Sequence, residues 1–324
     1  MEKIAMLGTF PEDGLRRMEE ACRGRYELVC CRRPEELPRA RGAAYAVLRG
    51  IPIGPAELDL LGPGVKLYHR WGVGYDTVDV EEAGRRGIPV AISTGVNAQA
   101  VAELAVLLML AGERRLFALA ERARQGESWK EDLTDDCYLL SGKRIGLLGL
   151  GNIGSRVCGM VRAFGAEVSY YDPFRASPAR EAELGIAFVP FDELIAGADI
   201  LSLHLPLTDG TYHTIGRDVF SQMKRTALLV NTARGGIVDT EALVEALEQK
   251  TIWGAALDTT EEEPLPADHP LFRMDRVIVL PHAGGSTRDL NAAMVACILE
   301  HIQAVASGER LDRKFLANAS FFEF

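Results

Sequence analysis

Residues 144–154 read RIGLLGLGNIG, and residues 155–165 continue as SRVCGMVRAFG. The first stretch is an apolar run typical of a buried strand, and the second has the spacing of a helix. Glycines at 149, 151 and 154 allow a tight turn, a close approach of the backbone to a pyrophosphate and close packing of helix on strand. The helix start also offers unpaired N–H groups and a positive dipole end to phosphates. This stretch predicts a strand–turn–helix unit that binds a dinucleotide.

The next apolar run, EVSYYD at 167–172, ends in an aspartate. Asp172 follows Gly154 at close to the ~20 residues expected for a carboxylate that holds the adenosine ribose hydroxyls. A carboxylate there repels a 2′-phosphate, so NAD is favoured over NADP. Arg175, three residues further on, is a cation that could pair with a 2′-phosphate and therefore favours NADP.

Short apolar runs alternate with amphipathic stretches along nearly the whole chain. The runs before residue 98 are KIAML (3–7), YELVCC (26–31), YAVLR (45–49), VKLYH (65–69) and IPVAI (88–92). The later runs are RIGLLG (144–149), EVSYYD (167–172), ADILSLH (198–204), ALLVN (227–231), GAALD (254–258) and RVIVLP (276–281). Continuous apolar strands separated by helices are typical of parallel sheets built from βαβ units.

The two groups of runs predict an α/β protein with two doubly wound parallel-sheet domains, a Rossmann NAD-binding domain inserted in a flavodoxin-like substrate domain. We expect a substrate-binding (catalytic) domain at 1–98, completed by 287–324, and the NAD-binding domain at 99–286. The join, 98–124, reads as one long helix that is apolar on most faces and therefore buried. A second helical stretch, 288–307, is expected to carry the chain back to the first domain.

Composition excludes several classes of function. The chain has 324 residues, enough for two domains at ~150 residues each. Its net charge of −10 repels phosphate backbones, so nucleic-acid binding is disfavoured. The N-terminus shows no signal peptide, and the most apolar stretch, 100–111, is shorter than the ~20 residues that span a bilayer. We therefore expect a cytoplasmic protein without a membrane partner.

The cysteines and histidines indicate no metal centre. The six cysteines form no CxxC pair, which argues against a zinc ribbon or a disulfide framework and suits a reducing compartment. Four histidines show no metal-ligand spacing and are expected at the surface or in loops; these are His69, His213, His269 and His301.

Three reactive side chains each follow an apolar run. Arg234 lies in TARGG after ALLVN, Glu263 in TTEEEP after GAALD, and His282 in PHAGGST after RVIVLP. The carboxyl ends of parallel strands meet at one edge of a sheet, where such proteins bind ligands. We therefore expect the three side chains to converge.

Their chemistry fits a redox reaction on a small acid. Arg234 can grip a carboxylate with two parallel hydrogen bonds and polarise an adjacent carbonyl. His282 can act as an acid or base near neutral pH, and Glu263 can fix its tautomer and raise its pKa. A nicotinamide would supply the hydride.

The motifs GLLGLGNIG, YYDP, HLPLT, NTARGG, ALDTTEEEP and PHAGGST occur in this order. Together with RWGVGYDTVDV (70–80) and STGVNAQAVAEL (93–104), they resemble the NAD-dependent D-isomer-specific 2-hydroxyacid dehydrogenase family over nearly the whole chain. The resemblance implies Arg234, Glu263 and His282 as the catalytic set, with His282 as the proton donor in oxo-acid reduction.

The resemblance also implies the contacts of the cofactor and of the substrate. Cofactor contacts are expected from Gly149, Gly151, Asn152, Ile153, Gly154, Asp172, Pro206, Thr232, Ala233, Asp258, Gly284 and Gly285. Substrate contacts are expected from Arg49, Trp71, Gly72, Val73, Gly74, Arg234 and His282, with the backbone N–H groups of 72–74 around the substrate carboxylate. Family members are typically dimers that associate through the nucleotide domain, so we expect a homodimer.

The sequence leaves the substrate open. Glyoxylate, hydroxypyruvate, 3-phosphoglycerate and bulkier oxo acids all fit the motifs, and Trp71 and Thr260 depart from common family residues near the pocket. The alternative function is that of a non-catalytic NAD(H)-sensing protein of corepressor type. A methyltransferase is disfavoured, because its chemistry does not need the Arg, Glu and His set.

Overall fold

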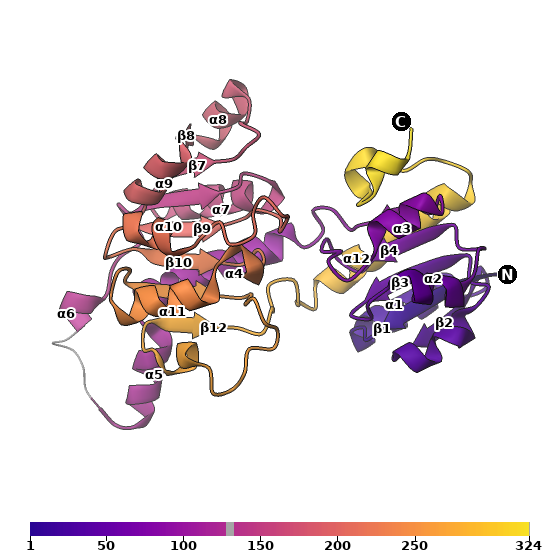
Figure 1. The fold of residues 1–324 in the computed structure, drawn as a ribbon, viewed down its shortest axis with the longest axis horizontal. Coiled ribbons are helices and arrows are strands. Elements are labelled where there is room, and N and C mark those ends of the chain that lie inside the picture. The colour runs from indigo at the N-terminus through magenta and orange to yellow at the C-terminus, as the bar shows by residue number, and fades with distance from the viewer. Residues whose placement is uncertain (128–132, 324) are drawn as a thin grey trace. The chain divides into compact units, whose positions relative to one another are not determined.

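The computed structural model describes residues 1–127 and 133–323, which form two compact units (Figure 1). Unit 1 comprises Met1–Asn97 and Ser286–Phe324, and unit 2 comprises Ala98–Gly285. Each unit contains one sheet in which all strands are parallel. The prediction of two doubly wound α/β sheets is confirmed.

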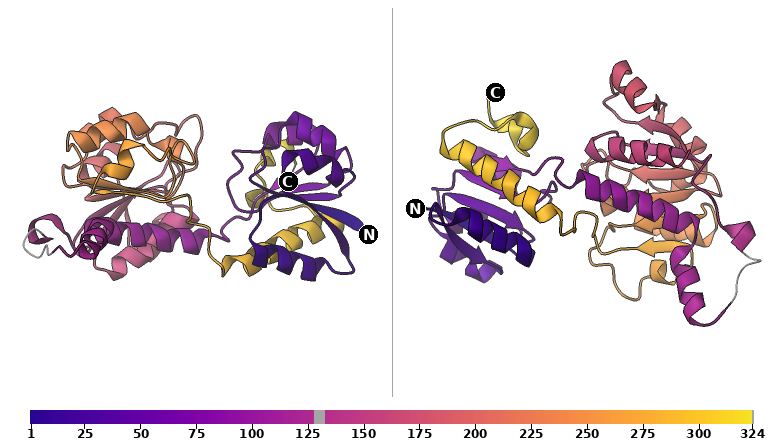
Figure 2. Two further views of the ribbon diagram at one scale, coloured as in Figure 1. Left: turned by 90° about the horizontal axis from the view of Figure 1, so that it is seen from below. Right: turned by 180° about the vertical axis from the view of Figure 1, so that it is seen from behind.

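The sheet of unit 1 has five strands in the order β2-β1-β3-β4-β5, which is the flavodoxin-like order. The strands are β1 (Glu2–Gly8), β2 (Tyr26–Cys31), β3 (Tyr45–Arg49), β4 (Leu67–Arg70) and β5 (Val90–Ala91). One face is covered by α1 (Glu12–Cys22) and α12 (Leu290–Ala306), and the other by α2 (Pro55–Leu61) and α3 (Val80–Arg85) (Figure 2).

Strand β1 shows why this sheet needs helices on both faces. Ile4 and Met6 point into the core beneath α1 and α12, whereas Ala5 and Leu7 point into the opposite core. All four side chains are fully buried. Because successive side chains of a strand face opposite sides, the apolar run is stable only between two helical layers.

The C-terminal segment packs against the N-terminal part of unit 1. Asn318 is buried, and its side-chain oxygen accepts a hydrogen bond from the Val90 backbone N–H at 2.9 Å. Its side-chain nitrogen donates to the carbonyls of Ile88 at 3.0 Å and Val80 at 3.3 Å. The ring of Phe321 lies against Gly84, where a Cβ atom would approach it to 2.4 Å. The two ends of the chain therefore build one unit.

The sheet of unit 2 has seven strands in the order β12-β11-β10-β9-β6-β7-β8. The strand order reverses between β6 and β9, and ligands of such sheets bind in the crevice at the carboxyl ends there. The strands are β6 (Arg144–Leu148), β7 (Glu167–Tyr171), β8 (Ala187–Phe188), β9 (Ile200–Leu203), β10 (Leu228–Asn231), β11 (Gly254–Leu257) and β12 (Val277–Val279).

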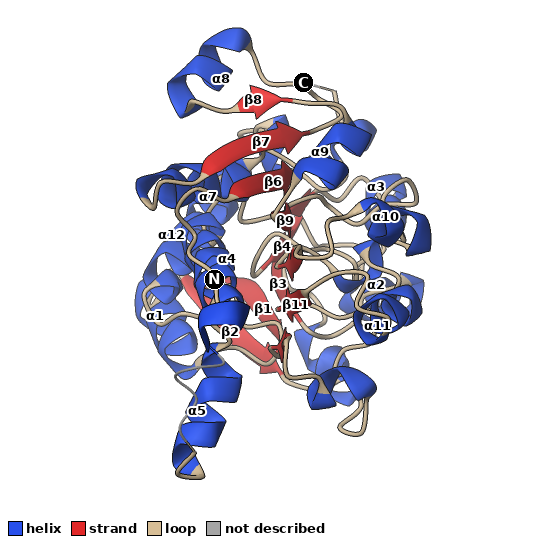
Figure 3. Ribbon diagram, turned by 90° about the vertical axis from the view of Figure 1, so that its left-hand side faces the viewer, coloured by secondary structure: helices blue, strands red, loops and turns tan. Residues whose placement is uncertain are grey.

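Helices cover both faces of this sheet (Figure 3). One face carries α4 (Ala98–Glu113) and α7 (Asn152–Ala163), and the other carries α9 (Phe191–Gly197), α10 (Arg217–Gln222) and α11 (Thr240–Glu248). The remaining helices are α5 (Leu116–Arg124), α6 (Leu133–Asp136) and α8 (Pro178–Leu184).

The prediction of one buried helix over 98–124 is wrong in its second half. Helix α4 ends at Glu113, because Arg115 takes a left-handed conformation with φ of 49°. Helix α4 is buried along most of its length, but no residue of α5 is buried. The turn at Arg115 redirects the chain, so the apolar residues of α5 no longer face the core.

In the described part of the chain, no helix combines the length and the apolar character needed to cross a membrane.

Candidate active site

The glycine turn after β6 is shaped by close backbone contacts. Gly149 has φ of 101°, and a Cβ atom on it would lie 2.7 Å from the carbonyl oxygen of His204. A Cβ atom on Gly154 would lie 2.3 Å from the carbonyl oxygen of Gly149. A Cβ atom on Gly151, by contrast, would meet nothing within 4 Å. Gly149 and Gly154 therefore allow the tight turn. Gly151 faces open space at the start of α7, beside Asn152 and Ile153.

This turn fits a bound dinucleotide. No side chain caps α7, whose N-cap is Gly151, so its first N–H groups can meet a phosphate. Nδ1 of His204 and Oγ1 of Thr232 are buried without a hydrogen-bond partner among the described residues. Buried polar atoms of this kind normally have a partner, which a ligand can supply. Burial also lowers the pKa of His204 to about 4, so this ring is neutral.

Asp172 lies at the end of β7 and is held against the glycine turn. Its carboxylate accepts hydrogen bonds from the backbone N–H groups of Leu150 and Phe174, both at 2.9 Å. Arg175 donates to both oxygens of Glu181 at 2.8 and 3.0 Å, and this bonding lowers the pKa of Glu181 to about 2. Arg175, the cation that would favour NADP, is therefore paired with Glu181 and does not neutralise the carboxylate of Asp172.

The loop after β10 presents Arg234. Asn231, fully buried at the end of this strand, accepts a hydrogen bond from the Ala233 N–H at 3.0 Å and donates to the Arg234 carbonyl at 2.9 Å. The Arg234 guanidinium donates to the Ala233 carbonyl at 2.7 Å. Asn231 was not predicted as a site residue, although an asparagine at the end of a buried apolar run indicates a side chain that hydrogen-bonds the backbone of the following loop.

The loops after β10 and β11 touch through their backbones. A Cβ atom on Gly235 would lie 1.9 Å from the carbonyl carbon of Thr260 and 2.3 Å from the nitrogen of Glu261. Only glycine fits this approach. The contact brings the loop of Arg234 against the loop that carries Glu263.

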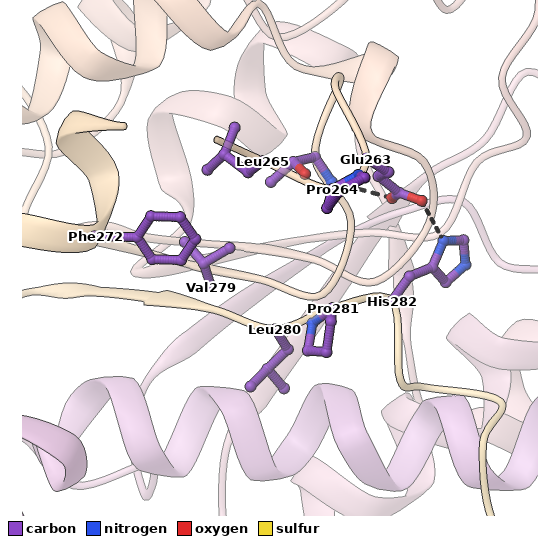
Figure 4. A pocket seen from close by; sticks show the side chains of 9 residues that line it. Glu263, Pro264, Leu265, Phe272, Val279, Leu280, Pro281 and His282 are labelled. Carbon is purple, nitrogen blue, oxygen red and sulfur yellow. Dashed lines mark hydrogen bonds and ion pairs between the residues drawn. The ribbon is translucent and has the colours of Figure 1, made fainter. Parts of the chain in front are cut away.

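Glu263 and His282 form a hydrogen-bonded pair (Figure 4). Nδ1 of His282 lies 2.8 Å from Oε2 of Glu263, and Oε1 of Glu263 accepts from the Thr260 N–H at 3.3 Å. An ionised carboxylate only accepts, so Nδ1 carries a hydrogen. Nε2 of His282 has no hydrogen-bond partner within the described residues, and the imidazole can exchange a proton with a ligand there.

The pair shifts the pKa of both partners. The hydrogen bond to Glu263 raises the pKa of His282 above its usual value, against the opposing effect of burial. Burial is the largest single influence on Glu263 and works to raise its pKa, but the hydrogen bond and charge of His282, the Thr260 N–H and the charge of Arg234 together lower it. The charge of Arg234 lowers the pKa of both groups. The three residues that the sequence predicts to converge are therefore within electrostatic range of one another.

Asp258, at the end of β11, holds the backbone turn that carries His282. His282 has φ of 54°, which is uncommon for a residue with a side chain, and its N–H donates to the Asp258 carbonyl at 2.8 Å. The Asp258 carboxylate accepts from the N–H groups of Ala283 at 2.7 Å and Gly284 at 2.8 Å. Asp258 was expected to contact the cofactor; its bonds to this turn were not foreseen. Gly285 follows in the same turn.

The other expected cofactor residues lie in neighbouring loops of unit 2. Pro206 follows β9, and its carbonyl accepts from the Thr211 hydroxyl at 2.7 Å. Thr232 and Ala233 follow β10 and are buried. They line the same carboxyl edge of the sheet as the glycine turn.

The expected substrate residues of unit 1 lie at the carboxyl ends of the adjacent strands β3 and β4: Arg49 is the last residue of β3, and Trp71 follows β4. The Arg49 guanidinium donates to the Thr9 carbonyl. Trp71 packs edge-on against Phe10 at 5.4 Å and against Gly14, where a Cβ atom would lie 2.8 Å from its ring.

The loop that follows Trp71 is tied down at both ends. The Gly72 carbonyl accepts from the Ser93 N–H at 2.9 Å, and the Gly74 carbonyl accepts from Nε of Arg70 at 2.7 Å. Gly72 has φ of 131°, a conformation that favours glycine. The Gly72 N–H donates to the Arg70 carbonyl at 2.9 Å, so in this conformation it is not available to a substrate carboxylate. The N–H groups of Val73 and Gly74 remain predicted contacts.

An apolar cavity of about 390 Å³ lies beside the Glu263–His282 pair (Figure 4). Its lining combines this pair and Thr260 with apolar side chains, namely Pro264, Leu265, Phe272, Val279, Leu280 and Pro281.

Comparison with known families agrees with this geometry. Residues 106–284 match the family model described as D-isomer specific 2-hydroxyacid dehydrogenase, NAD binding domain. The chain belongs to this family. It is an NAD-dependent 2-hydroxyacid dehydrogenase, and the resemblance noted in the sequence is confirmed.

Relatives that match 95% or more of this chain support the same assignment. A glyoxylate reductase of Thermococcus litoralis is 35% identical over 319 residues, which cover 95% of this chain and 94% of that protein. A D-3-phosphoglycerate dehydrogenase of Methanocaldococcus jannaschii is 37% identical over 311 residues, covering 95% of this chain and 58% of that protein. The structure of a D-isomer specific 2-hydroxyacid dehydrogenase from Lactobacillus delbrueckii ssp. bulgaricus in complex with NAD has a TM-score of 0.80 and 27% identity. That match covers 98% of this chain and all of the other.

Proposed function

We propose that this dehydrogenase interconverts a small 2-oxo acid and its D-2-hydroxy acid, with His282 as the proton donor and Arg234 as the carboxylate clamp. The observation that carries the proposal is the 2.8 Å hydrogen bond between Glu263 and Nδ1 of His282, which leaves Nε2 to the substrate. The backbone contact at Gly235 supports it, because it holds the Arg234 loop beside the loop of Glu263.

Each residue has one task in this mechanism. NAD(H), when bound, accepts or supplies the hydride. Arg234 holds the substrate carboxylate with two parallel hydrogen bonds and polarises its 2-oxo group. His282 donates the proton from Nε2 as the carbonyl oxygen gains charge, and Glu263 stabilises the imidazolium before transfer. In the oxidation direction His282 accepts the proton.

We propose glyoxylate and hydroxypyruvate as the preferred substrates. Relatives at 35–42% identity are named glyoxylate reductase, and others at 37% are named glyoxylate/hydroxypyruvate reductase B. Arg49 provides a cation near the glycine loop, so phosphohydroxypyruvate belongs in the same assay.

The test is NADH oxidation with a graded panel of glyoxylate, hydroxypyruvate, phosphohydroxypyruvate and phenylpyruvate. We expect the largest kcat/KM with the two smallest acids. A larger value with phenylpyruvate would overturn the substrate proposal. Tight NADH binding without turnover on any acid would favour an NAD(H)-sensing function instead.

The proposed role of His282 predicts a pH dependence. Oxo-acid reduction needs the protonated imidazole, so its rate should fall as pH rises through the pKa of His282, which Glu263 raises above 6.5. Hydroxy-acid oxidation needs the neutral imidazole, so its rate should rise over the same range. Glu263→Gln removes the stabilising charge and should move both limbs to lower pH. Identical pH profiles of the variant and the wild type would contradict this role of Glu263.

Asp172 is expected to set the preference for NADH over NADPH. In Asp172→Ser the ratio of kcat/KM for NADH to that for NADPH should fall about 10–100-fold, because a hydrogen bond to the ribose is lost and repulsion of the 2′-phosphate disappears. Asp192→Ser, an exposed aspartate on α9, is the matched control and should keep the wild-type ratio. A ratio unchanged in Asp172→Ser would contradict the assignment.

We propose a homodimer that associates through α4 and α5 of unit 2. Leu107, Leu116 and Phe117 are 53, 48 and 55% exposed there, and an exposed apolar surface of this kind marks an interface. Sedimentation should give a mass of twice 35.4 kDa. Phe117→Glu should release the monomer, whereas the control Leu60→Glu in unit 1 should not. A dimer that survives Phe117→Glu would place the interface elsewhere.

A further inference from the structure

Unit 1 buries two of the histidines that the sequence analysis predicted for the surface or loops. His69 on β4 is 1% exposed and His301 on α12 is 4% exposed, so that prediction is wrong for both. Helix α12 packs against β4, which brings together residues that are far apart in the sequence. Cys297 lies one turn before His301 on α12, on the same face of that helix.

The hydrogen bonds of His69 define which of its ring nitrogens is available. Nδ1 lies 2.9 Å from the Arg70 carbonyl oxygen, which only accepts, so Nδ1 carries the hydrogen. Nε2 then presents its lone pair toward Nδ1 of His301, 2.9 Å away. The His69 ring is buried and its printed partners are a backbone carbonyl and another imidazole, so the ring is neutral. A neutral imidazole whose other N–H donates to a backbone carbonyl has the arrangement usual for a metal ligand.

We propose that His69, Cys297 and His301 form a zinc site that joins β4 to α12. Their ligand atoms all lie within 4.8 Å of one another. Zinc binds nitrogen at ~2.0–2.1 Å and sulfur at ~2.3 Å, so neighbouring ligand atoms of a tetrahedral site are ~3.3–3.6 Å apart. Because Nε2 of His69 accepts, Nδ1 of His301 carries the hydrogen of this bond. To admit the ion, His301 must shift that hydrogen to its Nε2, and the two rings must turn so that the nitrogens separate by a few tenths of an ångström.

The surroundings suit a divalent ion with an open fourth position. Two imidazoles and one thiolate are a ligand set that zinc accepts, and binding would displace the Cys297 proton to solvent. Cys297 is partly exposed, so water can reach the fourth position from its side.

The site would stiffen the base of the glycine loop. His69 precedes Arg70, whose guanidinium holds the Gly74 carbonyl, and Ser93 bonds both the Arg70 and the Gly72 carbonyls. A metal that ties β4 to α12 would therefore restrain the strand end from which this loop starts. The proposed role is structural and does not depend on the reaction proposed above.

The test uses the full-length chain, reduced, stripped with a chelator and titrated with Co²⁺ and Zn²⁺. We expect one equivalent of Co²⁺ to produce a thiolate-to-cobalt charge-transfer band in the near ultraviolet. Cys297→Ser should abolish this band. Cys297→Ser and His301→Gln should each weaken Zn²⁺ binding by at least about 100-fold, because loss even of partners outside the ligand set costs about 10–100-fold.

Two variants outside the cluster are the controls. Cys137 is another partly exposed cysteine, and His213 is paired with Glu261 in unit 2. Cys137→Ser and His213→Gln should keep the band and the affinity for Zn²⁺. A wild-type titration without a charge-transfer band would overturn the proposal, whatever the folding of the variants. A band that survives Cys297→Ser, or Zn²⁺ binding lost in His213→Gln, would also overturn it.

Discussion

Replacing His282 with glutamine is expected to lower kcat for oxo-acid reduction by about 10²–10⁴-fold, the usual contribution of a positioned general acid. Glutamine has a similar reach and can still hydrogen-bond Glu263, but it has no proton to give at neutral pH. NADH binding should stay within about twofold of the wild type, because the change removes a group used only in the transition state. Single-turnover kinetics and fluorescence titration with NADH measure the two quantities separately.

The test is the contrast between the large loss of turnover and the nearly unchanged NADH binding. His213→Gln is the matched control, because His213 is also paired with a glutamate but is assigned no part in proton transfer. It should keep kcat within about threefold of the wild type, as expected for a residue that does not act in the transition state. Equal loss of turnover and of NADH binding in His282→Gln would indicate a disrupted turn, and would remove the support for His282 as the proton donor.

Replacing Arg234 with alanine is expected to lower kcat/KM by about 10²–10⁴-fold, since hydrogen bonds to charged groups contribute about 1.5–3 kcal/mol each and a carboxylate can receive two. Both parameters should change. KM should rise because the carboxylate is held less firmly, and kcat should fall because the carbonyl is less polarised. Steady-state kinetics with glyoxylate measures both.

Arg234→Lys separates charge from geometry. Lysine keeps the positive charge but lacks the planar pair of donors, so its kcat/KM should lie between those of the wild type and Arg234→Ala. Arg217→Ala, an exposed arginine on α10 that is paired with Glu245, should leave both parameters unchanged. A KM unaffected in Arg234→Ala would contradict the clamp.

The fold was predictable because its signals are local. The apolar runs mark the strands, and the spacing of Gly149, Gly151, Gly154 and Asp172 marks the nucleotide turn without knowledge of any distant contact. The reactive residues were predictable for a related reason. Each follows a strand of a parallel sheet, and that topology places their loops along one edge.

The features that escaped prediction depend on tertiary contacts. The burial of His69 and His301 results from the packing of α12 on β4, which no spacing along the chain encodes. The bonds of Asp258 to the turn after His282 depend on how β11 and β12 pair. Helix α5 continues the apolar stretch of α4 in the sequence, yet a single left-handed residue, Arg115, separates it from the core.

The construction of unit 1 from both ends of the chain has a consequence for synthesis on the ribosome. Unit 2 is continuous and can fold as soon as its last strand has left the exit tunnel. Unit 1 must wait for α12, because until then the face of its sheet that includes Ile4 and Met6 is covered only by α1. The nascent chain therefore carries an incomplete apolar layer through most of translation, and this is the stage at which aggregation or chaperone binding is expected.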